Sequence, residues 1–205
     1  MDRRIELIRK RADVVFGNDS VIAAFDQLLA IMISEAIDGF ANQLTVIVFE
    51  DGSIAMSDNG RGMYLDNWKA TIAGEFPPIV GNRLFPEYFS FFLPPNPKKE
   101  EIVHNQSTKY MDLFALNCVC ERFYFSANRA FTTTSLLFEK GKQIGDVKKE
   151  FALGRGTFIH FKFDNEVFPD PVPSKKFLQD RFGFLRTLLP GLKIEFRYRY
   201  GKKEP

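Results

Sequence analysis

The sequence predicts one α/β domain, a two-layer sandwich in which helices cover one face of a mostly antiparallel mixed sheet. Three observations support this. Apolar residues from Val21 to Ile37 recur with the period of a helix. Short β-rich runs follow one another through Asp-Gly and Lys-Gly turns, which is typical of hairpins. A second helical stretch precedes a last strand near residue 198. Strands joined by turns pair antiparallel, and amphipathic helices need a sheet on which to bury their apolar sides.

The composition is that of an ordinary globular protein. The chain has 205 residues, of which 45% are hydrophobic and 26% charged, enough for one substantial core. A net charge of +2 is too small to indicate nucleic-acid binding. The 23 phenylalanines predict either a Phe-packed core or a Phe-bearing partner surface. Without a secretory signal or an apolar run of about 18 residues, the sequence predicts a cytoplasmic protein with no membrane contact.

We expect the elements in a simple order within a single domain spanning residues 1–205. Residues 1–19 form an N-terminal arm, whose first 12 residues are helical or extended, and Ser20 caps the helix 21–37. An irregular, proline-rich, lid-like insertion occupies 64–110, and 199–205 form a tail. The other expected elements are strands at 44–49 and 53–57, a buried helix at 112–120, strands at 122–126, 130–139 and 157–163, a helix at 174–189 and a strand at 192–198.

The two cysteines do not indicate a metal site. Cys118 and Cys120 stand in an apolar stretch, and a zinc site needs a second pair of ligands. His104 and His160 are far apart and offer no completion. The sequence therefore favours buried, reduced thiols.

The sharpest local motif is the Asp-Asn-Gly-Arg-Gly run that begins at Asp58, directly after a predicted strand. A carboxylate at a strand end supplies a hydrogen-bond acceptor, and Gly60 and Gly62 allow a ligand to approach the backbone. Turns are made of the same residue types. Two interpretations stay open: Asp58 contacts a ligand, or it ends the strand and caps a turn.

In order and spacing, four segments resemble the ATPase domain of type II topoisomerases, as found in the B subunits of DNA gyrase and topoisomerase IV. These proteins belong to the Bergerat-fold, or GHKL, ATPases. The segments are the helix 21–37, the strand pair 44–57, the Asp58–Gly62 motif and the strand that follows Gly156. The resemblance covers about residues 9 to 198 and is weakest between 64 and 110.

The resemblance implies a role for each matched nucleotide-binding position. Asp58 would accept the adenine amino group, Gly62 would line the base pocket beside Gly60, and Thr157 would hold a water next to Asp58. Glu35 falls where these proteins have a glutamate that faces the motif arginine, here Arg61. That pair either borders the base or is a structural ion pair.

The same register shows departures at the positions that carry the chemistry. Gln27 stands at the position of the general base, and a glutamine amide cannot accept a proton near neutral pH. Ile31 stands where the magnesium-binding asparagine belongs and has no oxygen to offer. Residues 105–112, where a glycine-rich phosphate loop is expected, contain no glycine, although Lys109 is present as a point charge.

The sequence therefore predicts a degenerate ATPase domain that does not hydrolyse ATP, needs no cofactor and acts as a binding or regulatory module, for example towards gyrase or topoisomerase subunits. The expected partner is another protein or a second copy, with at most weak adenine-nucleotide binding. The alternative is a diverged gyrase-like protein that binds ATP and magnesium and hydrolyses ATP, with Glu35 or Asp26 as base. The Phe- and Pro-rich segment 76–97 either covers the pocket or docks a partner. The C-terminal basic residues indicate a solvated face rather than a nucleic-acid patch.

Overall fold

A computed structural model describes residues 3–17, 20–63 and 113–199. The elements, in chain order, are α1 (Arg3–Lys10), α2 (Ala12–Phe16), α3 (Ser20–Ile37), β1 (Gln43–Val48), β2 (Ile54–Asp58), α6 (Leu113–Cys118), β3 (Cys120–Arg129), β4 (Thr132–Glu139), β5 (Lys142–Gln143), β6 (Lys148–Phe151), β7 (Gly156–Phe163), α7 (Lys175–Leu188) and β8 (Lys193–Tyr198).

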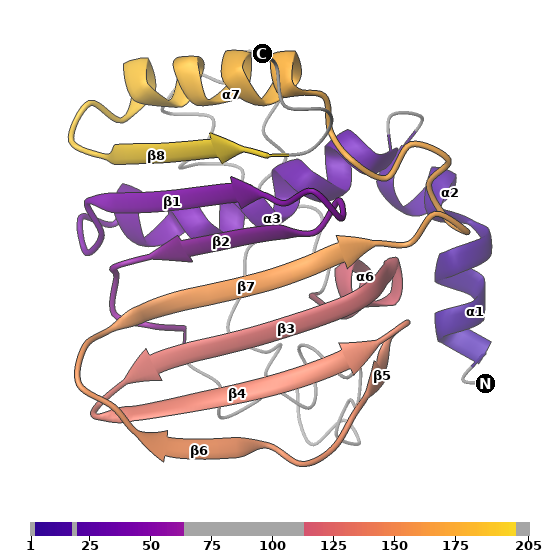
Figure 1. Cartoon of the computed structure of the whole chain (residues 1–205), viewed down its shortest axis with the longest axis horizontal. Helices are drawn as coiled ribbons and strands as arrows, with labels where there is room; N and C mark the ends of the chain where they lie inside the picture. Colours follow the sequence, from indigo (N-terminus) through magenta and orange to yellow (C-terminus); the bar gives the residue numbers. More distant parts are fainter. Residues whose placement is uncertain (1–2, 18–19, 64–112, 200–205) are drawn as a thin grey trace, which may run out of the picture.

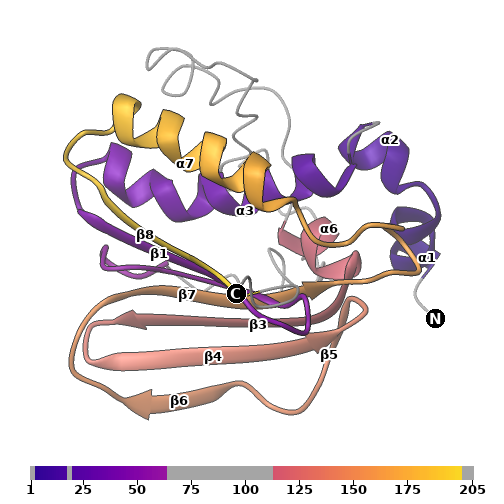
Figure 2. The same ribbon diagram turned by 45° about the horizontal axis from the view of Figure 1, so that its top comes forward.

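The strands form one eight-stranded mixed sheet in the order β5-β4-β3-β7-β2-β1-β8, with β6 also paired to β4. Neighbouring strands are antiparallel, except that β8 runs parallel to β1. Helices α3, α6 and α7 lie against one face, and the other face carries no helix from the described part of the chain (Figures 1 and 2). This two-layer arrangement confirms the predicted fold class.

Strand alternation and helix periodicity place the core between these two layers. Along β1, Leu44, Val46 and Val48 are buried, and the residues between them are not. In α3 the side chains of Phe25 and Leu28 are fully buried against the sheet. Each such side chain contributes about 1.5–3 kcal/mol by leaving water.

Phenylalanine fulfils both of the roles that its abundance suggested. Eight phenylalanines are among the largest fully buried side chains: Phe16, Phe25, Phe123, Phe125, Phe138, Phe161, Phe163 and Phe182. Four others are exposed: Phe40, Phe131, Phe151 and Phe158. The core is therefore Phe-packed, and the surface also carries aromatic side chains.

The N-terminal segment packs against the domain as two helices rather than lying as an extended arm. Arg9 in α1 is 11% exposed, donates to the Cys118 carbonyl at 3.0 Å and pairs with Asp164 at 2.7 Å. Asp164 is 2% exposed and lies just beyond β7. These contacts attach α1 to the end of the sheet.

The sequence prediction was wrong at one turn and missed two short strands. Ala130 and Phe131, predicted to begin a strand, form the β3–β4 turn with left-handed φ angles of 50° and 63°. β5 and β6 were not predicted, because two to four residues are too few to show alternation. The predictions for 64–110, including Lys109, His104, the segment 76–97 and most of 105–112, lie outside the described residues.

The described residues contain neither a membrane span nor a metal cluster. None of their helices combines the length and apolar character of a membrane span. No group of three His, Cys, Asp or Glu side chains among them is arranged to hold a metal ion. Cys118 and Cys120 are both buried and free of disulfides, as predicted.

Candidate functional site

The Asp58 motif forms a turn in the middle of the sheet, where β2 ends between β1 and β7. The Asp58 carboxylate accepts a hydrogen bond from the Gly60 N–H at 2.7 Å. The Asn59 side chain accepts from the backbone N–H groups of Asn42 and Gln43, each at 3.0 Å. The turn is thus fixed at both ends, and the Asp58 carboxylate has a defined position.

Both glycines of the motif are required by close packing. A Cβ on Gly60 would lie 2.7 Å from the Glu35 Cβ. A Cβ on Gly62, whose φ is +79°, would lie 2.2 Å from the Asn128 carbonyl oxygen. No side chain fits at either distance. The motif therefore brings α3, β2 and β3 together at one point.

Burial raises the pKa of Asp58 to about 6, the largest influence on this group. Hydrogen bonds from Gly60 and Thr157 oppose the shift, and the nearby Glu35 charge adds to it. Thr157 is 4% exposed, and its hydroxyl also accepts from the Met63 N–H at 3.1 Å. A half-buried carboxyl beside a hydroxyl is suited to a ligand that donates hydrogen bonds, such as an exocyclic amino group.

Glu35 and Arg61 form the ion pair that the sequence suggested. The guanidinium donates from Nε at 3.0 Å and from Nη2 at 2.8 Å, one bond to each carboxylate oxygen, and the Arg61 backbone N–H adds a third at 2.9 Å. These bonds lower the pKa of Glu35. The guanidinium carbon also lies 3.5 Å from the centroid of the Phe40 ring. Both carboxylate oxygens of Glu35 are therefore engaged.

Gln27, Ile31 and Glu35 follow one another at four-residue intervals along α3, so they share one stripe of the helix. Glu35 touches the Asp58 turn, and Gln27 lies about 12 Å further along the helix axis at 1.5 Å per residue. Gln27 is 3% exposed, and neither of its amide atoms has a hydrogen-bond partner among the described residues. Ile31 is partly buried and packs against the core.

Asp26 points away from this stripe and is held by α7. Its Oδ2 lies 2.5 Å from Nη2 of Arg181, and both side chains are less than a tenth exposed. Burial raises the pKa of Asp26 to about 7, and the Arg181 charge opposes this rise. The sequence predicted neither the pair nor its burial, because its two members are 155 positions apart.

Arg129 is a second residue that the sequence did not assign to the site. It donates from Nη1 to the Gly62 carbonyl at 3.1 Å, across 67 positions of sequence. Only the predicted neighbourhood of β3 and the Asp58 motif in the sheet could have suggested it. Arg129 ties the end of β3 to the turn.

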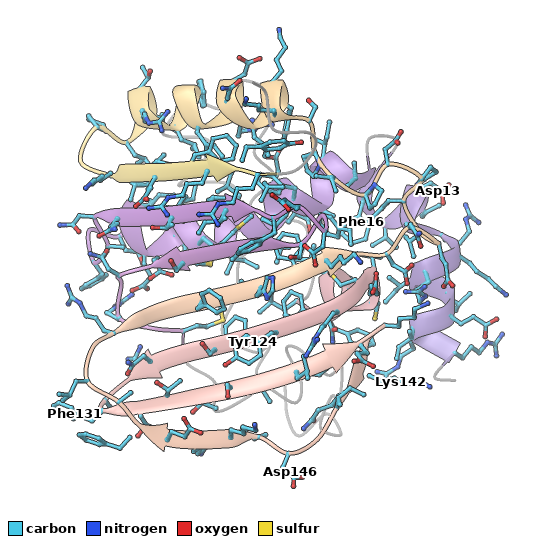
Figure 3. All side chains as sticks on the ribbon, viewed as in Figure 1. Asp13, Phe16, Tyr124, Phe131, Lys142 and Asp146 are labelled. Carbon is cyan, nitrogen blue, oxygen red and sulfur yellow. The ribbon has the colours of Figure 1, made fainter. Side chains whose placement is uncertain are left out.

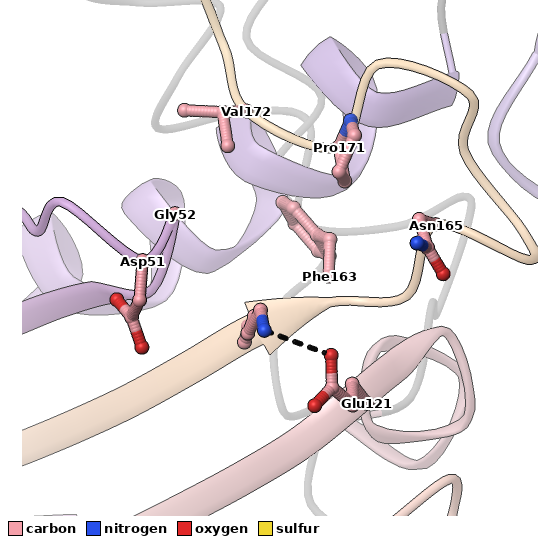
Figure 4. Close-up of a pocket in the computed structure, with 8 residues that line it drawn as sticks. Asp51, Gly52, Glu121, Phe163, Asn165, Pro171 and Val172 are labelled. Carbon is pink, nitrogen blue, oxygen red and sulfur yellow. Dashed lines mark ion pairs between the residues drawn. The ribbon is translucent and has the colours of Figure 1, made fainter. Parts of the chain in front are cut away.

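A small pocket of about 190 Å³ lies at the opposite ends of these strands, beside the β1–β2 turn (Figure 4). Glu121 and Lys162 pair there at 3.1 Å, next to Asp51 and Asn165. Since β2 runs from this turn to Asp58, the pocket is separate from the Asp58 motif.

Known proteins resemble this chain in sequence, although no protein-family model matches it. It is 25% identical over 172 residues to the B chain of DNA gyrase from Thermotoga maritima, a match that covers 82% of this chain and 25% of that protein. It is 26% identical over 175 residues to the B chain of DNA topoisomerase 4 from Rickettsia bellii, covering 82% and 25%. With the B chain of DNA gyrase from Staphylococcus aureus the identity is 26% over 203 residues, covering 94% and 30%.

Among solved structures, the 43K ATPase domain of Thermus thermophilus gyrase B in complex with an aminocoumarin superposes with a TM-score of 0.72 at 22% identity. The match covers 99% of this chain and 50% of that one. The chain thus spans about a quarter to a third of the length of these curated relatives.

Proposed function

Since this chain has the GHKL ATPase fold of the gyrase B ATPase domain, we propose that it is a degenerate member of that fold, which does not hydrolyse ATP and acts as a binding or regulatory module. The observation that carries the proposal is the α3 stripe, where an amide and an aliphatic side chain precede a glutamate already bound to Arg61.

Hydrolysis needs a proton acceptor near the attacking water and an oxygen ligand for magnesium. Gln27 supplies no usable acceptor, and its loss alone lowers a rate by about 10²–10⁴-fold. Ile31 supplies no ligand oxygen. Both are buried or partly buried on the helix that faces the Asp58 turn, so water cannot readily replace either group.

The two carboxylates that might replace the base are engaged elsewhere. Glu35 accepts three hydrogen bonds from Arg61, and its lowered pKa makes it a poorer base. Asp26 pairs with Arg181 in α7 at 2.5 Å. Neither contact favours the alternative of an active, rearranged ATPase.

The adenine side of the pocket supports residual recognition of a base. Asp58 and Thr157 offer a carboxyl and a hydroxyl beside a backbone turn without side chains at Gly60 and Gly62. Any such binding should be independent of magnesium, because the described stripe has no oxygen at position 31. We therefore propose weak nucleotide binding at most, together with a protein partner.

ATP turnover by the purified chain, measured with and without magnesium, tests the proposal. We expect no hydrolysis above background in the wild type, in Asp58→Ala or in the surface control Asp180→Asn. Magnesium-dependent turnover that disappears in Asp58→Ala and persists in Asp180→Asn would establish the active alternative. Calorimetry with a non-hydrolysable ATP analogue should give the same affinity with magnesium and with EDTA.

A further inference from the structure

One corner of the sheet carries an exposed apolar tip formed by Phe131, Phe151 and Leu153. Their exposed fractions are 64%, 76% and 77%. The rings of Phe131 and Phe151 stack with centroids 6.4 Å apart and planes 12° from parallel. Figure 3 labels Phe131 at this corner, where the β3–β4 hairpin ends. Large apolar side chains that gather in the open are typical of an interaction site.

The tip is held in place at a cost to the fold. Ala130 and Phe131 both have left-handed φ angles, which cost L-residues about 1–2 kcal/mol each. The Phe131 carbonyl accepts from the Ala152 N–H at 3.1 Å, and the Leu153 carbonyl accepts from the Asn128 side chain at 3.4 Å. A strained turn that presents an exposed ring is typical of a functional position.

Beside the tip, β6 offers a free strand edge. It pairs with β4 on one side, and no described strand pairs with its other side. All four of its residues are exposed. Unpaired backbone N–H and C=O groups on such an edge can accept an added strand from another chain.

The edge is positively charged. Lys148, Lys149 and Arg155 are exposed, and none of them forms a salt bridge with the described residues. Lysines often protect an edge strand from pairing. Here Phe151 and Leu153, both exposed on or next to the same strand, would counteract that protection.

The register defines what the edge can bind. Lys149 pairs with Thr134 and Phe151 with Thr132, so the two side chains point to the same face of the sheet. A strand beside β6 would therefore meet a cation and, two residues further, the stacked rings. A carboxylate and an apolar side chain two positions apart are complementary to this pattern.

We propose that the β6 edge and the tip of Phe131, Phe151 and Leu153 bind an extended acidic segment of a partner protein. The segment adds to β6 as a strand, with a carboxylate beside Lys149 and an apolar side chain on the stacked rings. This surface lies outside the Asp58 turn, and the ATPase measurement above does not depend on it.

A short labelled peptide in which Glu and Phe stand two positions apart, and its counterpart with Lys in place of Glu, test the proposal by fluorescence anisotropy. The wild type should bind the acidic peptide and not the basic one. Phe151→Ser should weaken binding about tenfold or more, as expected for an anchor residue. Lys149→Glu should reverse the preference between the two peptides. Leu7→Ser removes a 54% exposed apolar side chain from α1 and should change nothing.

Hydrogen exchange distinguishes strand addition from loose contact, because only an added strand protects the backbone amides of 148–151. A flat titration with the acidic peptide, or binding that Phe151→Ser leaves intact, overturns the proposal. So does self-association that Phe151→Ser abolishes, since the occupant would then be a second copy. Binding to anionic vesicles in place of the peptide also overturns it.

Discussion

Replacing Gly156 by alanine perturbs the point where β7 passes the Asp58 turn. A Cβ at this position would lie 2.1 Å from the Asp58 carbonyl oxygen, and φ is +128°, a conformation almost confined to glycine. The backbone strain costs about 1 kcal/mol or more. Relieving the overlap requires a shift of backbone rather than of a flexible side chain, which adds about 1–3 kcal/mol. We expect Gly156→Ala to lower the free energy of unfolding by about 3 kcal/mol.

Urea denaturation of matched glycine variants measures this effect, provided that the m-value stays constant. Gly145→Ala has a positive φ of +71° and no atom within 4 Å, so it should cost only the backbone strain, about 1 kcal/mol. Gly183→Ala lies in α7 with nothing within 4 Å and should gain up to about 1 kcal/mol. If Gly156→Ala is no less stable than Gly145→Ala, the tight packing of β7 on the Asp58 turn is wrong.

Three further predictions follow from individual residues. Replacing Ala130-Phe131 by Asn-Gly should raise the midpoint of urea unfolding, by about 1–2 kcal/mol in free energy, because these residues favour the left-handed turn; an unchanged midpoint contradicts the strain. Gln27→Leu should stabilise the fold by about 1–2 kcal/mol, because it removes a buried amide without a partner among the described residues; a loss of stability in the same assay would show that the amide is hydrogen-bonded. The folded pKa of Asp58, about 6, is above its unfolded value of 3.8, so its stabilisation is complete below about pH 4 and is lost as the pH rises through 6. Relative to Asp58→Asn, the wild type should lose roughly 3 kcal/mol across this window, and parallel pH profiles would exclude the shift.

Local patterns in the sequence were sufficient for most of the fold. Helix α3 and the β1–β2 hairpin were predicted to within one residue, because each shows a clear period and a turn signal. The turn at Ala130-Phe131 was placed in a strand, since neither residue belongs to the types that favour a left-handed turn. The parallel pairing of β8 with β1 joins segments about 150 positions apart and leaves no local signal.

The site was predictable where its residues are close in sequence or matched by the resemblance. Asp58, Gly60 and Gly62 form one motif, and the contact between Glu35 and Arg61 is present as suggested. Their roles towards a ligand remain predictions. The contact of Arg129 with Gly62 and the pair of Asp26 with Arg181 depend on how distant elements pack, so one-dimensional spacing could not indicate them.

The α3 helix explains how a pocket can lose its chemistry while the fold persists. Phe25, Leu28 and their buried neighbours on the sheet side provide the packing energy, which depends on apolar area. Gln27 and Ile31 lie on the stripe that leads to the Asp58 turn, where catalysis, rather than packing, would require a carboxylate and an amide oxygen. Substitutions on this stripe cost little core packing, so selection for a stable domain does not preserve them. The GHKL fold of the chain is therefore compatible with either activity or inactivity, and the side chains at positions 27 and 31 are the physical reason to expect inactivity.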